Sequence, residues 1–191
     1  MEAFLISTVS VALAEIGDKT QLLALVLAAR FRRPGTIVAA ILVATLANHA
    51  AAGVAGAWVA ALVPPAVQQW LVAVSFVAMG LWLLVPDDDD DAAARYPYGA
   101  FLTTLIAFFL VEIGDKTQIA TVVLAARYDP LWAVVAGTTV GMLAANVPVV
   151  FMGGVAANRL PMRLVHGVAA GLFVVLGVLA VPGVLPGVDL L

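Results

Sequence analysis

The sequence predicts an all-α integral membrane protein with six transmembrane helices arranged as two inverted three-helix repeats. Three observations support this fold class: an apolar composition, six long apolar runs, and a seven-residue motif that occurs twice. Of the 191 residues, 64% are apolar and 11% are charged, whereas soluble proteins average about 45–50% and about 25%. The lipid bilayer is therefore the first partner that we expect, and no nucleic-acid partner is indicated. The chain has no cysteine, which excludes disulfides and thiolate metal sites.

Six apolar runs come close to the length that a bilayer requires, because its hydrocarbon core of about 30 Å takes about 20 helical residues to cross. They cover residues 3–29, 36–62, 67–85, 98–126, 131–156 and 164–181. Proline, glycine, arginine and aspartate fill the segments between them, and these residues end a lipid-facing helix. Tryptophan and tyrosine fall mostly near the ends of the runs, as interfacial anchors do.

The first half of the chain recurs in the second. The motif from Glu15 to Gln21 returns letter for letter from Glu112 to Gln118. Each half holds three of the predicted spans, and an odd number of spans makes the second half enter the membrane from the opposite side. This is the inverted-repeat organisation of many transporters. We therefore expect a first repeat at residues 1–86, an acidic linker at 87–97 and a second repeat at 98–191.

The loops predict the orientation, because cytoplasmic loops of membrane proteins are enriched in lysine and arginine. One side of the predicted membrane carries Arg30, Arg32, Arg33, Arg95, Arg159 and Arg163. The other side carries only Arg127. We therefore expect the first side to be cytoplasmic and both termini to lie outside. We interpret the five aspartates at 87–91 as a solvated part of the cytoplasmic linker; a weak metal-attracting funnel is the alternative.

Both copies of the motif place charged residues in the middle of a predicted span. Glu15 and Asp18 lie in the first span, and Glu112 and Asp115 lie in the fourth. With two adjacent lysines, these carboxylates would cost on the order of 15 kcal/mol if they faced lipid. Residues three apart project from nearly the same face of a helix. Because the two halves are inverted, we expect both acidic pairs to meet in one midplane cavity.

Neutral groups near the acids extend this candidate site. Hydroxyl and amide oxygens come from Thr20, Gln21, Thr117 and Gln118. Gly17 and Gly114 permit close backbone approach or local unwinding, in which a backbone carbonyl becomes a further ligand. Asn48 and Asn146 recur at matching positions and either complete the coordination shell or form an interhelical hydrogen bond.

An oxygen-only site suits a hard divalent cation, since carboxylate, carbonyl and water ligands favour magnesium, calcium and manganese. Four carboxylates and two lysines leave an excess of two negative charges, which one divalent ion or two protons would neutralise. Competition between the metal and protons for the same carboxylates provides a basis for exchange. Lys19 and Lys116 have three open roles: they pair with their own acids, carry protons, or turn away from the site.

The doubled E-x-G-D-K/R-T/S signature in a duplicated six-helix chain resembles the Gdt-type cation exchanger family, which includes Golgi transmembrane protein 165 and bacterial manganese exporters. The resemblance covers essentially the whole chain. It implies manganese or calcium transport coupled to protons, with Glu15, Asp18, Glu112 and Asp115 matching the family's metal-binding acids. The metal is then a substrate, and no cofactor and no enzymatic activity are expected. The chain lacks the additional N-terminal segment of eukaryotic members, which indicates a bacterial inner-membrane protein.

Three alternatives accompany this interpretation. The acidic motif could form a structural ion-pair cluster, with Asp18 bound to Lys19 and Asp115 bound to Lys116, although buried ion pairs stabilise poorly. The chain could export small organic cations or amino acids on a related six-helix plan. A membrane-embedded lipid-phosphate hydrolase would need arginines at the site, whereas every arginine here lies at the end of a span. The sequence does not indicate an oligomer.

Overall fold

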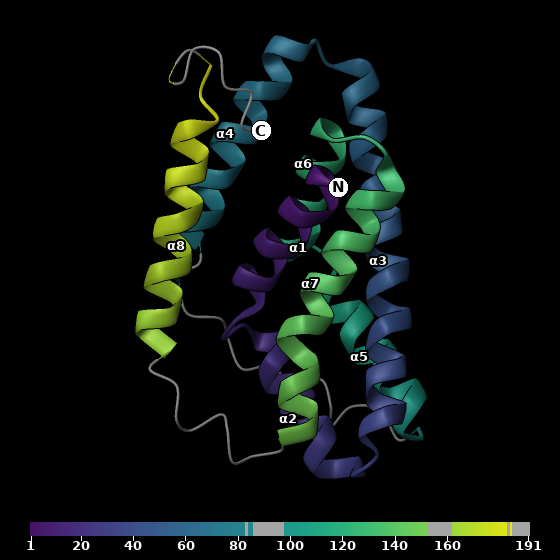
Figure 1. Ribbon diagram of the computed structural model, residues 1–191. Coiled ribbons are helices and arrows are strands. Elements are labelled where there is room, and N and C mark those ends of the chain that lie inside the picture. The colour runs from purple at the N-terminus through teal and green to yellow at the C-terminus, as the bar shows by residue number, and fades with distance from the viewer. Residues whose placement is uncertain (83, 86–97, 153–161, 183, 185–191) are drawn as a thin grey trace.

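The computed structural model describes residues 1–82, 84–85, 98–152, 162–182 and 184. Every regular element in this described part is an α-helix (Figure 1). The helices are α1 (Glu2–Glu15), α2 (Lys19–Phe31), α3 (Pro34–Leu62), α4 (Pro65–Trp82), α5 (Ala100–Glu112), α6 (Lys116–Arg127), α7 (Leu131–Met152) and α8 (Met162–Leu179). The all-helical fold class is confirmed for these residues, while the linker at 87–97 with its five aspartates lies outside them.

The structure corrects two of the predicted spans. The runs at residues 3–29 and 98–126 are not continuous helices, since α1 ends at Glu15 before α2 begins, and α5 ends at Glu112 before α6 begins. Gly17 has a φ of 84° and Gly114 a φ of 78°. Glycine adopts this left-handed conformation without the steric cost of a side chain. The two glycines therefore interrupt both motif helices at the same point.

The broken helices of each half pack against the long helix of the other half. Helix α1 packs against α7 and α5 against α3; likewise α2 contacts α7, and α6 contacts α3. The long helices α3 and α7 also contact each other (Figure 1). This reciprocal packing brings the two glycine breaks together, although 97 residues separate them in the chain.

Helices α4 and α8 form a pair at one side of the molecule (Figure 1). The rings of Phe76 and Phe173 lie 5.5 Å apart at the centre of this pair. A Cβ atom on Gly80 would lie 2.8 Å from the carbonyl oxygen of Ala170, and one on Gly177 would lie 2.9 Å from that of Ala73. The two phenylalanines, the two glycines and the two alanines are each related by the 97-residue offset of the motifs. The duplication therefore extends to the third helix of each half.

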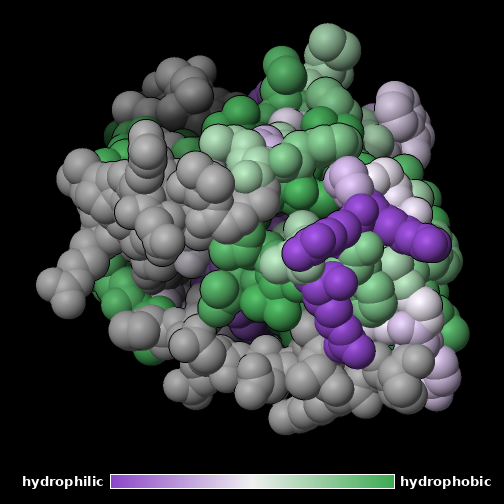
Figure 2. All heavy atoms as spheres, turned by 90° about the horizontal axis from the view of Figure 1, so that it is seen from below, coloured by the Kyte–Doolittle hydropathy of each residue, from purple (hydrophilic) through white to green (hydrophobic). Residues whose placement is uncertain are grey.

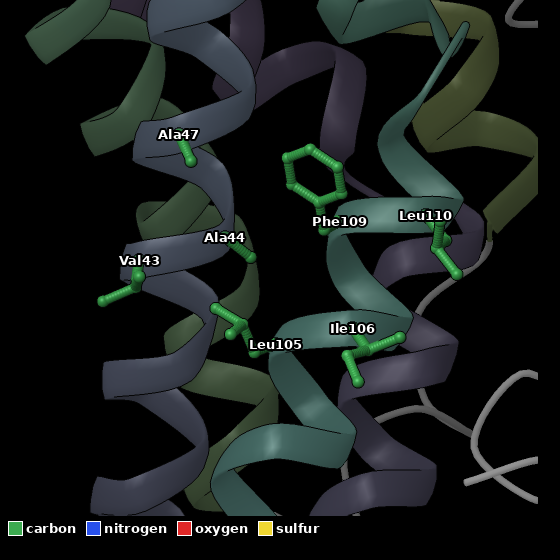
Figure 3. Close-up of a pocket in the computed structure, with 7 residues that line it drawn as sticks. All are labelled: Val43, Ala44, Ala47, Leu105, Ile106, Phe109 and Leu110. Atoms are coloured by element: carbon green, nitrogen blue, oxygen red, sulfur yellow. The ribbon is translucent and has the colours of Figure 1, made fainter.

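The two equivalent helix interfaces are packed differently. Glycines on α7 let α1 approach closely, since a Cβ on Gly137 would lie 2.5 Å from the carbonyl oxygen of Phe4, and one on Gly141 would lie 2.5 Å from that of Thr8. Helix α3 carries larger residues at this level, and an apolar pocket of about 310 Å³ separates it from α5 (Figure 3). The pocket is lined by Val43, Ala44, Ala47, Leu105, Ile106, Phe109 and Leu110.

Two described helices, α3 and α7, are long and apolar enough to cross a membrane. Buried helices of soluble proteins can meet the same criterion. Seen from below, the most hydrophilic side chains gather in one area beside apolar ones (Figure 2). Arg30, Arg32 and Arg33, where α2 meets α3, are all exposed.

Candidate metal centre

The two helix breaks bring the acidic residues of both motifs into the interior. Glu15 and Glu112 are the last residues of α1 and α5, and Asp18 and Asp115 immediately precede α2 and α6. All four are buried, with at most 3% of any of them exposed. Glu15, Glu112 and Asp115 each direct one carboxylate oxygen to within 4.8 Å of the other two. Acids from both halves therefore meet at one point.

The fourth acid, Asp18, lies in an ion pair. Lys116 Nζ is 2.6 Å from Asp18 Oδ1, and Lys19 Nζ is 2.8 Å from Asp115 Oδ1. Each lysine thus binds the aspartate of the opposite motif. A helix begins at each lysine and directs its side chain across the interface. These pairs differ from those considered from the sequence, in which Asp18 binds Lys19 and Asp115 binds Lys116 within one motif.

Threonine hydroxyls orient the two glutamates. Thr20 Oγ1 donates to Glu15 Oε2 at 2.5 Å, and Thr117 Oγ1 donates to Glu112 Oε2 at 2.8 Å. The second oxygens, Glu15 Oε1 and Glu112 Oε1, accept no hydrogen bond within the described structure, and neither does Asp115 Oδ2. Burying an unsatisfied polar group costs about 1–3 kcal/mol, and more when the group is charged. The three converging acids thus each carry a buried carboxylate oxygen with the chemistry to accept a cation or a proton.

Gln21 and Gln118 stabilise the helix breaks, a role that the sequence did not indicate. Their Oε1 atoms accept the backbone N–H groups of Gly17, at 2.8 Å, and Gly114, at 2.7 Å. The Gln21 amide also donates to the carbonyl of Ala145 on α7 at 2.8 Å. These side-chain oxygens therefore satisfy backbone donors that the interrupted helices expose, where we had expected neutral ligands.

The repeated asparagines lie on the long helices beside the site. Asn48 accepts a hydrogen bond from the Gln118 amide and donates to the carbonyl of Phe109 at 3.3 Å. Interhelical hydrogen bonding of this kind is one of the two roles that the sequence suggested for Asn48. Asn146 Nδ2 lies 3.5 Å from Glu15 Oε2, and its Oδ1 accepts no hydrogen bond within the described residues. Asn146 is therefore the asparagine adjacent to the acids.

Trp82 contacts Lys116, a position that the sequence did not predict. Its place near the end of the third predicted span suggested an interfacial anchor. In the structure its ring lies beneath Lys116, with Nζ 5.9 Å from the ring centroid, a distance at which a cation–π attraction operates. The apolar pocket of Figure 3 takes no part in the centre, because its lining side chains offer no cation ligand.

Comparison of the sequence with known proteins identifies the family of this chain. The sequence profile described as "Divalent cation/proton antiporter GDT1" matches residues 3–91 and 100–184. A Vibrio cholerae protein described as "Putative manganese exporter" is 51% identical over 177 residues, covering 92% of this chain and 88% of the relative. "GDT1-like protein 5" of Oryza sativa subsp. japonica is 38% identical over 82 residues, covering 43% of this chain and 35% of the relative. No solved structure matches.

The family match covers both motifs and, apart from Glu2, all eight described helices. The family consists of membrane transporters, not enzymes, and its divalent cation is a substrate and not a cofactor. The expected resemblance is confirmed. The chain belongs to the GDT1 family of divalent cation/proton antiporters.

Proposed function

We propose that this protein exports Mn²⁺ from the bacterial cytoplasm in exchange for protons, through a site formed by Glu15, Asp18, Glu112 and Asp115. One observation carries the proposal: acids from both repeats converge within 4.8 Å in the buried centre of the molecule. Opposite ligands on one hard cation such as Ca²⁺ lie about 4.6–5.2 Å apart, so one ion could contact all three converging acids. Asp18 would join the site when Lys116 moves.

The chemistry of the site supports a hard divalent cation. The three converging residues offer only carboxylate oxygens as ligands. Carboxylate oxygens favour manganese, calcium and magnesium over softer metals. His49 is buried and its nitrogens have no hydrogen-bond partner in the described structure, but it is not among the converging ligands. The description of the Vibrio cholerae relative favours Mn²⁺ as the transported ion. Ca²⁺, which shares the same oxygen chemistry, is the second candidate.

Proton exchange follows from competition for the same oxygens. Glu15 Oε1, Glu112 Oε1 and Asp115 Oδ2 accept no hydrogen bond in the described structure. A bound metal would neutralise them, and so would protons. Alternate occupancy by one metal ion or two protons keeps the buried centre near neutrality in both halves of the cycle. Lys19 would leave Asp115 Oδ1 when the metal arrives, since a cation and an ammonium group repel each other.

We also propose the six-span, inverted architecture, with residues 1–86 and 98–191 as the repeats and both termini outside. Each broken pair, α1 with α2 and α5 with α6, would count as one span. The reciprocal packing of α1 on α7 and α5 on α3 supports the inversion. Exposed arginines where α2 meets α3 support a cytoplasmic position for that end.

A manganese-sensitive bacterial host without its own exporter tests the function. The intact chain should restore growth on Mn²⁺, and Glu15→Gln or Asp115→Asn should each abolish the protection. Glu2→Gln is the matched control, because Glu2 is an exposed acid on the same helix as Glu15. Full protection by either site variant, at equal protein abundance, would contradict a site shared by both repeats. In proteoliposomes, Mn²⁺ transport without a counter-flow of protons would reject the exchange.

A further inference from the structure

The two cross-repeat ion pairs are equivalent in sequence but differ in how well they are covered. The side chains of Lys116 and Asp18 are 2% and 1% exposed. On the other side of the centre, Asp115 is 1% exposed but the side chain of Lys19 is 25% exposed. The structure thus combines a closed side at Lys116 with a more open side at Lys19. Because the motifs are identical, residues outside them cause this difference.

Trp82 accounts for the closed side. It is the last residue of α4, and its ring lies 5.9 Å from Lys116 Nζ. The 97-residue offset of the repeat relates Trp82 to Leu179, the last residue of α8. An aliphatic side chain at that place has no aromatic face to attract an ammonium group. The chain therefore has an aromatic cover for one lysine and an aliphatic residue at the matching position for the other.

The placement of the α4/α8 pair shows the same asymmetry. Helix α4 packs against α6, and α8 touches α1. The repeat would equally allow α8 to pack against α2, but no comparable packing occurs within the described residues. Val72, Phe76 and Met79 of α4 form one buried cluster with Ala120 of α6. Ala120 lies one helical turn beyond Lys116, so α4 covers α6 beside the centre.

We propose that Trp82 is a positioning residue that closes the α6 side of the cation site by holding Lys116 on Asp18. Opening this side requires the α4/α8 pair to move off α6, which removes the ring from Lys116 and releases Asp18. In this arrangement an ion would reach Asp115 from the side of Lys19, which is the more exposed of the two lysines. This inference rests on the proposed function, because the closed side is one of the two access routes of the exchange cycle.

The absence of cysteine from the chain makes a single-cysteine reporter free of background. Ala120→Cys places a thiol on the part of α6 that α4 covers, at a residue that is 1% exposed. A membrane-impermeant methanethiosulfonate reagent, applied to either face in proteoliposomes, should label it slowly. Adding Trp82→Leu, which copies the residue at position 179, should raise the labelling rate about tenfold. That factor corresponds to about 1.4 kcal/mol, between the values for an exposed and a desolvated cation–π contact.

Two controls separate closure from general disruption. Trp82→Phe keeps an aromatic ring and should label nearly as slowly as the parent. Trp70→Leu removes a tryptophan from the same helix that is 52% exposed, and should also label slowly. Thermal unfolding in detergent establishes that each variant is folded, and fast labelling of a folded Trp82→Phe would also contradict the proposal.

The proposal fails if folded Trp82→Leu labels at the parent rate, or if Trp70→Leu accelerates labelling as much. The measurement needs no metal transport. Faster labelling in Trp82→Leu therefore supports the closure by itself, and a negative manganese-protection assay would then refute only the proposed function.

Discussion

Replacing Gly114 with alanine tests whether the helix break positions the acids. Gly114 has a φ of 78°, and a Cβ atom added to it would meet no heavy atom within 4 Å. The substitution therefore adds no clash, and its cost is the left-handed backbone conformation itself, roughly 1–2 kcal/mol for a residue with a side chain. Relief of this strain would extend α5 toward α6 and displace Glu112 from Asp115. We expect Gly114→Ala to lower both stability and Mn²⁺ transport.

Gly171→Ala provides the matched control. Gly171 lies inside α8, also has no heavy atom within 4 Å of its Cβ position, and has no positive φ. Alanine should stabilise such a helix interior by about 0.5–1 kcal/mol. The two variants should thus differ by about 2 kcal/mol, and each kcal/mol corresponds to about 2–4 °C in unfolding temperature for a chain of this length. Thermal unfolding in detergent and transport in proteoliposomes measure the two effects. Equal unfolding temperatures, with full transport by Gly114→Ala, would refute a functional helix break.

Two further predictions concern the side chains around the acids. Thr20→Val and Thr117→Val each remove a hydroxyl that donates to a buried glutamate, so Mn²⁺ binding measured by calorimetry should weaken about tenfold, the equivalent of about 1.4 kcal/mol. Thr121→Val is the control, since its hydroxyl donates to the backbone carbonyl of Thr117 and not to an acid, and equal binding by all three variants would contradict the orienting role. Lys116→Met should destabilise the protein by about 3–5 kcal/mol because it removes a cation from buried Asp18, whereas Lys19→Met should cost less because Lys19 is 25% exposed. Thermal unfolding compares the two lysine variants, and a larger loss for Lys19→Met would contradict the described asymmetry.

The convergence of acids from both motifs could be expected from the sequence because the motif is local and repeated. Acids such as Glu15 and Asp18 within an apolar run require compensation, and an identical second copy has the same requirement, so we expected the two copies to meet. The pair of central glycines also indicated a thin or unwound level in both helices. The sequence left open whether the helices pack closely or unwind at Gly17 and Gly114, because apolar composition does not reveal φ at these residues; the structure shows a break at both.

The remaining features depend on how separate helices meet. The contact of Lys19 with Asp115 follows from the register between the two motifs, which no single motif encodes. Trp82 near the end of a predicted span gave no signal for contact with Lys116, because that contact needs α4 to pack against α6. The hydrogen bond from the Gly17 N–H to Gln21 likewise depends on the backbone conformation at the break, which the sequence does not specify.

Calorimetric titration of the purified protein with Mn²⁺ tests the central claim most directly, namely that acids from both repeats bind one ion. We predict one Mn²⁺ per chain, and loss of that binding in both Glu15→Gln and Glu112→Gln. Two independent Mn²⁺ ions per chain, with each substitution abolishing only one of them, would contradict it.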